Sequence, residues 1–319
     1  MKIRIIIFFI LSTIIISCTS HKENSKENLI PFRWESFDLN GKHYKYGAML
    51  IPVEIEGIDK QFEMQFDLGA NSVIIYENPL KTILNKYPSL KKNYIKDDDD
   101  PVFCTNLNLN HYSSSIDSLR VYKNYGSSDN FQNLKHIGTV GQAEIKNKIL
   151  IIDYPNQTLE ILNNKEQIIE KDFNYTPIEV LSYGKLKFNL TINNEEYPFL
   201  FDTGSGIVPA TTIDKILYDK ITIADTSLQD TITGNSWGNP VTLWGNTINN
   251  SIKIGANNIN ANDNRFYFTN DKRIVDGIRQ MGLYGAVGNT FFINDVIVID
   301  LINNRFGIKK KKRTANTQS

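Results

Sequence analysis

Two short segments far apart in this chain repeat one pattern, and that repetition restricts how the chain can fold. Each is an apolar, strand-like run that ends in an aspartate and then a glycine: Phe66-Asp67-Leu68-Gly69 and Phe201-Asp202-Thr203-Gly204. A carboxylate at the end of a buried strand is costly unless main-chain N–H groups or hydroxyls bind it. The residues that we expect to support the two acids are Gly69, Thr203, Gly204 and Ser205.

The repeat extends well beyond the two aspartates. Val140-Gly141 follows the first and Val287-Gly288 the second, and thirteen residues after each valine comes a further aspartate, Asp153 or Asp300. A turn and another strand close each block. Internal similarity of this kind indicates duplicated structural units. The sequence therefore predicts two similar lobes that contribute Asp67 and Asp202, whereas Asp153 and Asp300 precede tight turns and are predicted to cap them.

Together these residues resemble the pepsin-like, two-lobed aspartic peptidases, and each half resembles a retropepsin-type subunit. The resemblance covers roughly residues 46–308, with one departure: Leu68 stands where the family has threonine. It implies an all-β fold of two pseudo-symmetric, β-barrel-like lobes of the pepsin or acid-protease type with a few short helices. The expected division is 1–17 signal peptide, 18–45 lipidated N-terminus and tether, 46–165 and 180–308 the two lobes, and 309–319 basic tail.

Alternating apolar and polar residues favour strands on both sides of each aspartate. Short helices are expected near 80–84 and 213–217, and the strand at 113–122 is matched to 247–255 in the second lobe. The Gly- and Asn-rich segment 233–245 predicts a hairpin, with Trp237 either covering a bound peptide or packing into the core. In the first lobe 102–111 is expected in the equivalent place, and Tyr125-Gly126-Ser127 is set aside because it follows the strand.

The first residues are typical of a bacterial targeting signal. Lys2 and Arg4 precede an apolar run that is short for a membrane span, and Ile15-Ile16-Ser17-Cys18 resembles a lipobox. We expect Cys18 to be lipidated and to anchor the protein to the bacterial cell envelope, at the outer membrane or periplasmic face. An ordinary signal peptide or a membrane anchor is the alternative.

Composition limits the remaining classes of function. Lys plus Arg and Asp plus Glu number 35 each, so no net charge argues for nucleic acid. Cys18 and Cys104 are the two cysteines, and the four histidines are scattered, so neither a disulfide, a metal site nor a cofactor is expected. The acidic run 97–100 fits a contact to calcium or to a basic substrate, or simply a solvated loop.

The resemblance implies an aspartic endopeptidase in which Asp67 and Asp202 share a proton and activate a water molecule. Its expected partner is an extended peptide or protein substrate, bound by strand-like pairing to a monomer. The alternative is a catalytically inactive, peptidase-like lipoprotein that binds extended peptides or an envelope partner. In that case each aspartate merely stabilises its turn.

The lipid anchor yields a direct test. We expect Cys18→Ala to abolish the incorporation of radiolabelled fatty acid into the expressed protein, because the thiol is the only attachment point in the lipobox. Cys104→Ala is the matched control and is expected to leave labelling intact. Unchanged labelling of the Cys18→Ala protein would refute the anchor.

Overall fold

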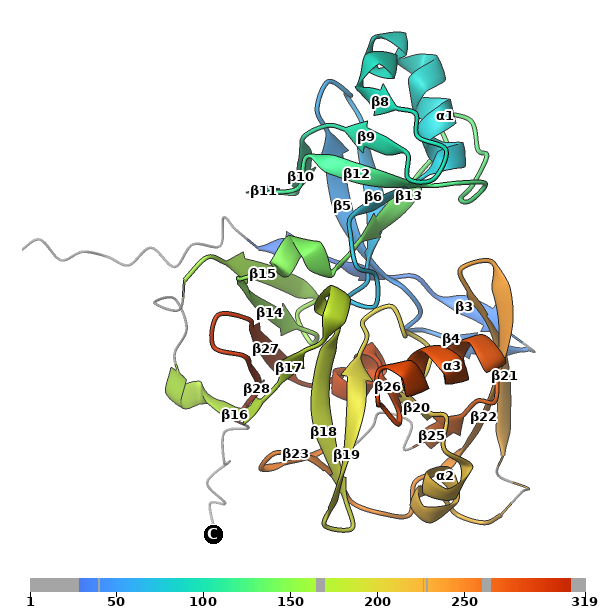
Figure 1. Cartoon of the computed structure of the whole chain (residues 1–319), viewed down its shortest axis with the longest axis vertical. Helices are drawn as coiled ribbons and strands as arrows, with labels where there is room; N and C mark the ends of the chain where they lie inside the picture. Colours follow the sequence, from blue (N-terminus) through green and yellow to red (C-terminus); the bar gives the residue numbers. More distant parts are fainter. Residues whose placement is uncertain are drawn as a thin grey trace, which may run out of the picture.

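The computed structural model describes residues 29–39, 41–164, 170–225, 227, 229–259 and 265–310. Cys18, the signal segment 1–17 and most of the basic tail lie outside them. Figure 1 shows two lobes, one above the other, that consist mainly of strands and meet beside a smaller sheet. This architecture confirms the predicted all-β fold of two lobes with a few short helices.

Lobe one is a sheet in the order β11-β10-β5-β6-β13-β7-β12-β9-β8, with β2 paired to β5. Helix α1 (Glu77–Lys86) follows β7 and buries Leu80 and Ile83, close to the predicted position. The strands are β2 (Arg33–Trp34), β5 (Met49–Ile55), β6 (Gln61–Phe66), β7 (Ile74–Tyr76), β8 (Tyr94–Ile95), β9 (Val102–Cys104), β10 (Leu107–Leu109), β11 (Tyr112–Ser113), β12 (Ser118–Tyr122) and β13 (His136–Val140), with the 3₁₀ turns η2 (Pro88–Asn93) and η3 (Gln142–Ile145).

The sheet of lobe two has the equivalent order, listed here from its other end: β21-β22-β25-β20-β26-β19-β18-β23-β24, with β17 paired to β18. Its helix α2 (Lys215–Ile221) begins after Asp214, whose side chain accepts the Leu217 N–H. The other elements are β17 (Glu179–Val180), β18 (Leu186–Ile192), β19 (Glu195–Phe201), β20 (Ala210–Thr212), β21 (Asp230–Ser236), β22 (Asn239–Thr247), β23 (Ile252–Ile254), β24 (Asn257–Ile259), β25 (Arg265–Phe268), β26 (Gly285–Val287), α3 (Lys272–Gln280), η5 (Ser182–Gly184) and η7 (Asn289–Phe292).

The pairing of strands shows which elements of the two lobes are equivalent. β7 runs parallel to β12, as β20 runs parallel to β25, while β10 pairs with β5 as β23 pairs with β18. The predicted match of 113–122 to 247–255 is therefore wrong, because the true counterpart of β12 is β25. The long β21–β22 hairpin of lobe two changes the spacing between equivalent strands, so distance along the sequence misleads.

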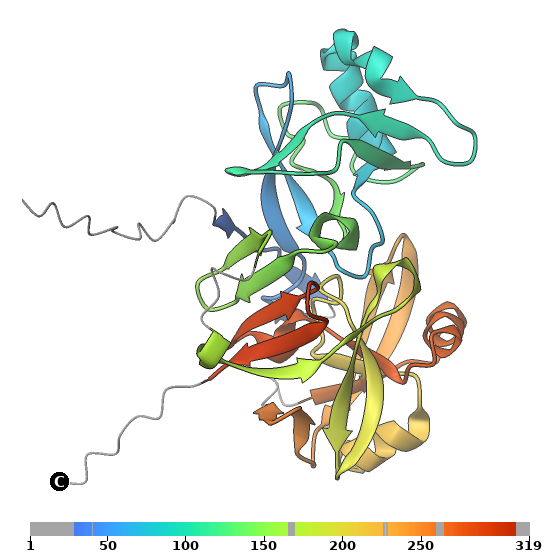
Figure 2. The same cartoon turned by 60° about the vertical axis from the view of Figure 1, so that its left-hand side comes forward.

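The closing blocks of the two lobes meet in a third sheet of order β1-β15-β14-β27-β28-β16. β14 and β27 lie antiparallel at its centre, so that Ile152 faces Ile297, and Figure 2 shows the two blocks side by side. The strands are β1 (Ile30–Pro31), β14 (Ile149–Asp153), β15 (Thr158–Leu162), β16 (Phe173–Pro177), β27 (Val296–Asp300) and β28 (Arg305–Lys309), with the 3₁₀ turn η4 (Glu170–Asp172). This sheet joins the lobes through backbone hydrogen bonds.

Asp153 and Asp300 cap the turns of this central sheet, as predicted. Asp153 accepts the main-chain N–H of Asn156 at 3.0 Å, and Asp300 accepts those of Ile302 and Asn303 at 3.1 and 3.0 Å. Asp300 is fully buried, and Arg305 Nε also donates to it at 2.7 Å. Both aspartates therefore have a structural role outside the cleft.

The segment before lobe one is folded, which corrects the predicted tether as far as its described residues go. β1 pairs with β15, β2 pairs with β5, and the hairpin β3 (Phe37–Leu39)–β4 (Lys42–Tyr44) reaches lobe two. There Lys42 forms an ion pair of 2.9 Å with Asp230, and Tyr44 packs in a cluster with Val208 and Tyr267. We call residues 29–48 the N-terminal segment; it contacts all three sheets.

One large cluster of buried side chains extends through both lobes and the central sheet. Strands such as β18 alternate buried with more exposed residues, as expected for a sheet with one covered face. Cys104 is a half-buried free cysteine on β9, consistent with a packing role. Within the described part of the chain no helix is both long and apolar enough to cross a bilayer.

Candidate active site

Asp67 and Asp202 occupy equivalent places directly after β6 and β19. In each lobe the aspartate N–H donates to the valine of the Val-Gly pair, Asp67 to Val140 O at 3.0 Å and Asp202 to Val287 O at 2.9 Å. The glycines of these pairs are required by packing. A Cβ on Gly141 or Gly288 would collide with carbonyl oxygens of the adjoining aspartate loop, so the repeated Val-Gly positions each loop.

The structure brings the two carboxyl groups together. A Cβ on Gly69 would collide with the Asp202 carboxylate, just as one on Gly204 would collide with that of Asp67, and the charge of Asp202 acts on Asp67. Each loop therefore crosses directly beside the acid of the opposite lobe. Glycine is needed at both positions because no side chain fits between loop and acid.

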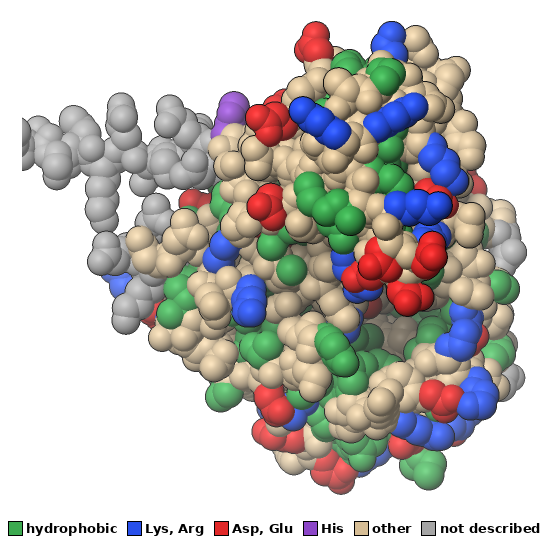
Figure 3. Space-filling view, turned by 45° about the horizontal axis from the view of Figure 1, so that its top comes forward, with side chains coloured by type: hydrophobic (Ala, Val, Ile, Leu, Met, Phe, Trp, Pro, Cys, Tyr) green, Lys and Arg blue, Asp and Glu red, His purple; other side chains and the backbone are tan. Residues whose placement is uncertain are grey.

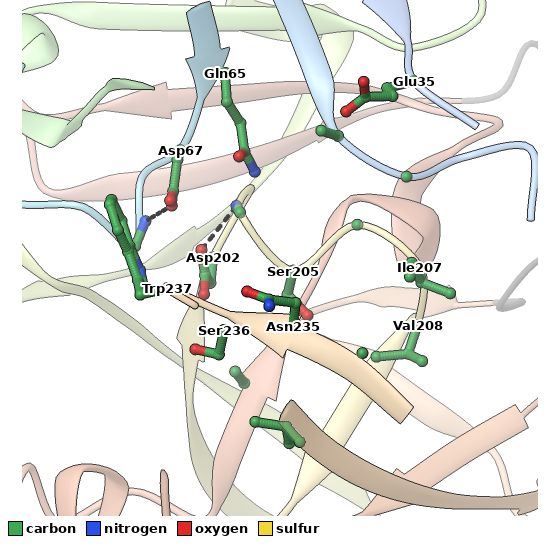
Figure 4. Close-up of a pocket in the computed structure, with 18 of the residues that line it drawn as sticks. Glu35, Gln65, Asp67, Asp202, Ser205, Ile207, Val208, Asn235, Ser236 and Trp237 are labelled. Atoms are coloured by element: carbon green, nitrogen blue, oxygen red, sulfur yellow. Dashed lines mark hydrogen bonds between the residues drawn. The ribbon is translucent and has the colours of Figure 1, made fainter. Parts of the chain in front are cut away.

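Main-chain N–H groups hold each carboxylate in place, as the sequence predicts (Figure 4). Asp67 Oδ1 accepts from Gly69 N at 2.8 Å and from Ala70 N at 3.2 Å, while Asp202 Oδ1 accepts from Gly204 N at 2.8 Å. Ser205 lies on the cleft wall, and its N–H donates to the Asp202 carbonyl at 3.1 Å.

Asp67 is the buried member of the pair, with 7% of its surface exposed. Burial raises the pKa of Asp67 well above its ordinary value of 3.8, and the charge and hydrogen bond of Asp202 raise it further. The Gly69 N–H and the Lys185 ammonium lower that pKa by smaller amounts. Because two adjacent carboxylates cannot both ionise, the pair keeps one proton over a range of pH.

A hydroxyl locks the two loops together from one side only. Thr203 is fully buried; its Oγ1 donates to Phe66 O at 3.0 Å and accepts from Leu68 N at 2.8 Å. The equivalent position in lobe one is Leu68, which is fully buried among apolar side chains and has no hydroxyl to return these bonds. A threonine hydroxyl therefore joins the two loops from lobe two alone.

Two further contacts hold the aspartate loops, and sequence reasoning missed both. The Lys185 ammonium of lobe two donates to the Gly69 carbonyl of lobe one. Below the Asp202 loop, Tyr154 OH donates to Asn289 Oδ1 at 2.7 Å and Asn289 Nδ2 donates to Thr203 O at 2.5 Å. The one available signal was that Asn289 directly follows the repeated Val-Gly.

The two acids lie in a cleft of about 870 Å³ between the lobes. Figure 3 shows the hollow at the surface, with hydrophobic and acidic side chains along its edge. Trp237 lines the cleft from the two-residue turn of the β21–β22 hairpin, and its ring lies 5.1 Å from Tyr122 and 6.1 Å from Tyr125 of lobe one. The hairpin of lobe two thus reaches across to the opposite lobe.

The part of lobe one that faces the β21–β22 hairpin differs from two expectations. The counterpart of the β21–β22 hairpin is the short β8–β9 pair, since β9 pairs with β12 as β22 pairs with β25, so the expected range 102–111 contains only its second strand. Tyr125, Gly126 and Ser127, excluded on sequence grounds, do line the cleft. Their loop returns over α1, where Asn78 N donates to Tyr125 O at 3.1 Å, and this return was not visible in the order of the strands.

The acidic run 97–100 forms a paired surface turn. Asp97 Oδ1 accepts the N–H of Asp99 at 2.8 Å, and Asp100 pairs with Arg120 at 2.7 Å. Over the described residues, no cluster of three or more His, Cys, Asp or Glu side chains is placed to bind a metal ion. Of the two interpretations, these contacts favour the solvated loop.

No protein-family model matches the sequence, and no curated protein matches it. Among solved structures the chain is similar to the crystal structure of an aspartic proteinase from Irpex lacteus, with a TM-score of 0.48 and 12% sequence identity over 91% of this chain and 99% of that one. The chemistry of the cleft is therefore derived from its own geometry.

The raised pKa of Asp67 predicts a pH-dependent gain in stability for Asp67→Asn. The folded state keeps a proton that the unfolded chain releases, so this carboxyl stabilises the fold fully below its unfolded pKa, and the contribution is lost as pH rises through the folded pKa. Asparagine retains the hydrogen bonds without ionising. We expect Asp67→Asn to raise the melting temperature at pH 7 and to leave it nearly unchanged at pH 3, as measured by circular dichroism. Parallel curves for the two proteins would contradict the assignment.

Proposed function

We propose that this protein is an aspartic endopeptidase, in which a water molecule between Asp67 and Asp202 hydrolyses a peptide bond. The observation that carries the proposal is the pair of adjacent carboxyl groups, one of them buried with a raised pKa, in a cleft between two lobes. A cap or a turn requires no such pairing. Two adjacent acids in a partly buried site cost free energy, and such groups cluster at functional sites.

The chemistry follows from the position of the shared proton. Asp202 accepts a proton from the water as its oxygen attacks the carbonyl carbon, while Asp67 gives its proton to the carbonyl oxygen. In the resulting neutral diol, Asp202 passes its proton to the amide nitrogen, the C–N bond breaks, and Asp67 regains a proton from one hydroxyl. The products are a carboxylic acid and an amine, and the pair returns to its starting state.

The cleft accommodates an extended chain across the dyad. Main-chain groups along the Asp202 loop, from Gly204 to Val208, line one side, and the hairpin with Trp237 covers the other. Strand-like pairing binds any sequence through its backbone, so side-chain preference is left to the walls. Trp237 half-buries its ring against Tyr122 and Tyr125, so opening for a substrate requires these aromatic contacts to separate.

We propose in addition that the enzyme is held at the bacterial envelope by a lipid on Cys18. This part of the proposal is supported by the lipobox-like sequence alone. The alternative to catalysis, a lipoprotein that binds extended peptides without cleaving them, is favoured by one observation: Leu68 leaves the lock between the loops one-sided. The experiments below distinguish the two functions.

The purified protein without its first 28 residues is expected to cleave a mixed peptide pool, with the greatest rate at acidic pH, where one proton on the pair is retained. Asp67→Asn and Asp202→Asn are each expected to lower the rate about 10²–10⁴-fold, because each removes one half of the acid–base pair. Asp153→Asn, at the surface turn, is the control and keeps the rate. Mass spectrometry of the products measures cleavage; tight binding by all variants without any cleavage would favour the binding function.

Restoring the missing hydroxyl tests the lock. Under the pseudo-two-fold symmetry, Thr at position 68 would direct its hydroxyl to main-chain groups beside Thr203, as Thr203 does to Phe66 and Leu68. One such hydrogen bond is worth about 0.5–1.5 kcal/mol, so we expect Leu68→Thr to raise kcat about two- to tenfold. Valine has the shape of threonine but lacks the hydroxyl, so Leu68→Val is expected to lower kcat. Equal rates in Thr and Val variants would show that the hydroxyl has no role.

A further inference from the structure

The two walls of the cleft have different chemistry, although they derive from equivalent strands. Gln65 and Leu200 each precede their aspartate by two residues, and both line the cleft. Around Leu200 the wall is apolar, whereas around Gln65 it is polar and aromatic. We call Leu200, Val241, Ile274, Ile278 and Ala286 the lobe-two wall, and Glu35, Gln65, Tyr76, Tyr125 and His136 the lobe-one wall.

The lobe-two wall belongs to a packed apolar cluster. Leu200 and Ile278 are buried together with Leu283, and Ile274 and Ala286 pack against them from α3 and β26. Helix α3 is set in place by Asp271, whose side chain accepts the N–H groups of its first turn. This wall presents a rigid apolar surface to the cleft.

The lobe-one wall is a series of rings that ends at a carboxylate. Tyr76 lies 4.8 Å from Tyr125 and 5.5 Å from His136, and its hydroxyl bonds to Thr139 Oγ1 at 2.7 Å. Glu35 lines the same cleft as Tyr76 and His136, and its charge acts on both. Figure 4 shows the Glu35 carboxylate turned toward Gln65.

Glu35 is held by the N-terminal segment, outside the duplicated lobes. Its N–H donates to Ala48 O and its carbonyl accepts from Gly47 N, both at 2.8 Å, so the backbone is anchored to the start of β5. The side chain is half-buried at the cleft. Because this segment adds a residue to one wall only, it breaks the symmetry of the duplication.

The described residues that line the cleft include three acids, Glu35, Asp67 and Asp202, and neither lysine nor arginine. Burial lowers the pKa of His136, so that ring is neutral at pH 7. Arg33 also acts on Glu35, but its Nε and one terminal nitrogen bond to Glu63 at 2.6 and 2.5 Å. Among the described residues, no lysine or arginine forms an ion pair with Glu35, which lines the cleft.

Building on the proposed peptidase function, we propose that the lobe-one wall binds a lysine or arginine side chain next to the scissile bond, while the lobe-two wall binds an apolar side chain on its other flank. The methylene stem of a basic side chain packs along the Tyr76 and Tyr125 rings, and its charged end reaches Glu35. A charge-assisted hydrogen bond in a half-buried site is stronger than a neutral one, which supplies the preference.

Paired peptides test the preference. One member of each pair carries lysine beside a phenylalanine and the other carries norleucine, which is similar in length but uncharged; both orders, Lys-Phe and Phe-Lys, are included. In one order we expect the wild-type protein to hydrolyse the lysine peptide with at least about tenfold higher kcat/KM. Glu35→Gln is expected to reduce that ratio to below about threefold, and Glu54→Gln, an exposed glutamate outside the cleft, to leave it unchanged.

Two outcomes would overturn the proposal: a wild-type ratio near one in both orders, or a ratio that survives Glu35→Gln. Failure of the peptidase function itself gives a different result, the absence of cleavage of any peptide. In that case the same peptides, fluorescently labelled, are tested for binding to wild type and Glu35→Gln by anisotropy. A preference for lysine that depends on Glu35 supports a basic site at the lobe-one wall. Equal binding of the lysine and norleucine peptides refutes that site.

Discussion

Contact between two carboxyl groups is the constraint on which the rest of this structure depends. Like charges at hydrogen-bond distance repel unless one proton is shared, and the shared proton is stable only where burial disfavours a second ionisation. The fold meets these conditions with main-chain donors, such as the N–H groups of Gly69 and Gly204, and with glycines that leave room for the opposite acid. The central sheet then fixes the distance between lobes through the pairing of β14 with β27.

More than one contact holds the two aspartate loops together. Thr203 still bonds to both neighbours of Asp67, but the return contact comes from elsewhere: Lys185 reaches the Gly69 carbonyl, and Asn289 ties the Thr203 carbonyl to Tyr154 in the central sheet. A charged donor to a carbonyl is stronger than a neutral hydroxyl bond. The absence of threonine at position 68 therefore weakens one contact in a set, rather than removing the connection between the loops.

The sequence predicted the parts of this structure that are duplicated. The duplicated parts can be recognised because they recur: the two aspartate loops, the Val-Gly pairs and the closing strands. Their geometry follows from local rules about glycine and buried carboxylates. What occurs once was not predictable in the same way. The strands of the N-terminal segment are two or three residues long, and they pair with β15, with β5 or with each other, so no periodicity marks them. Glu35 and Tyr125 reach the cleft, and Lys185 reaches the Gly69 carbonyl, through such single, long-range contacts.

The unrepeated parts also solve a problem that duplication creates. A dyad related by a two-fold axis has no direction of its own, whereas a peptide does, so a symmetric cleft would accept a chain in either orientation. Divergence of Gln65 from Leu200 makes one flank polar and the other apolar, and the N-terminal segment adds a carboxylate to the polar flank alone. Asp67, the acid whose pKa burial raises, belongs to the lobe that carries this polar flank. Under the proposed function, the direction of a bound peptide is therefore set by the walls of the cleft, and the pair of acids acts on a peptide bound in that direction.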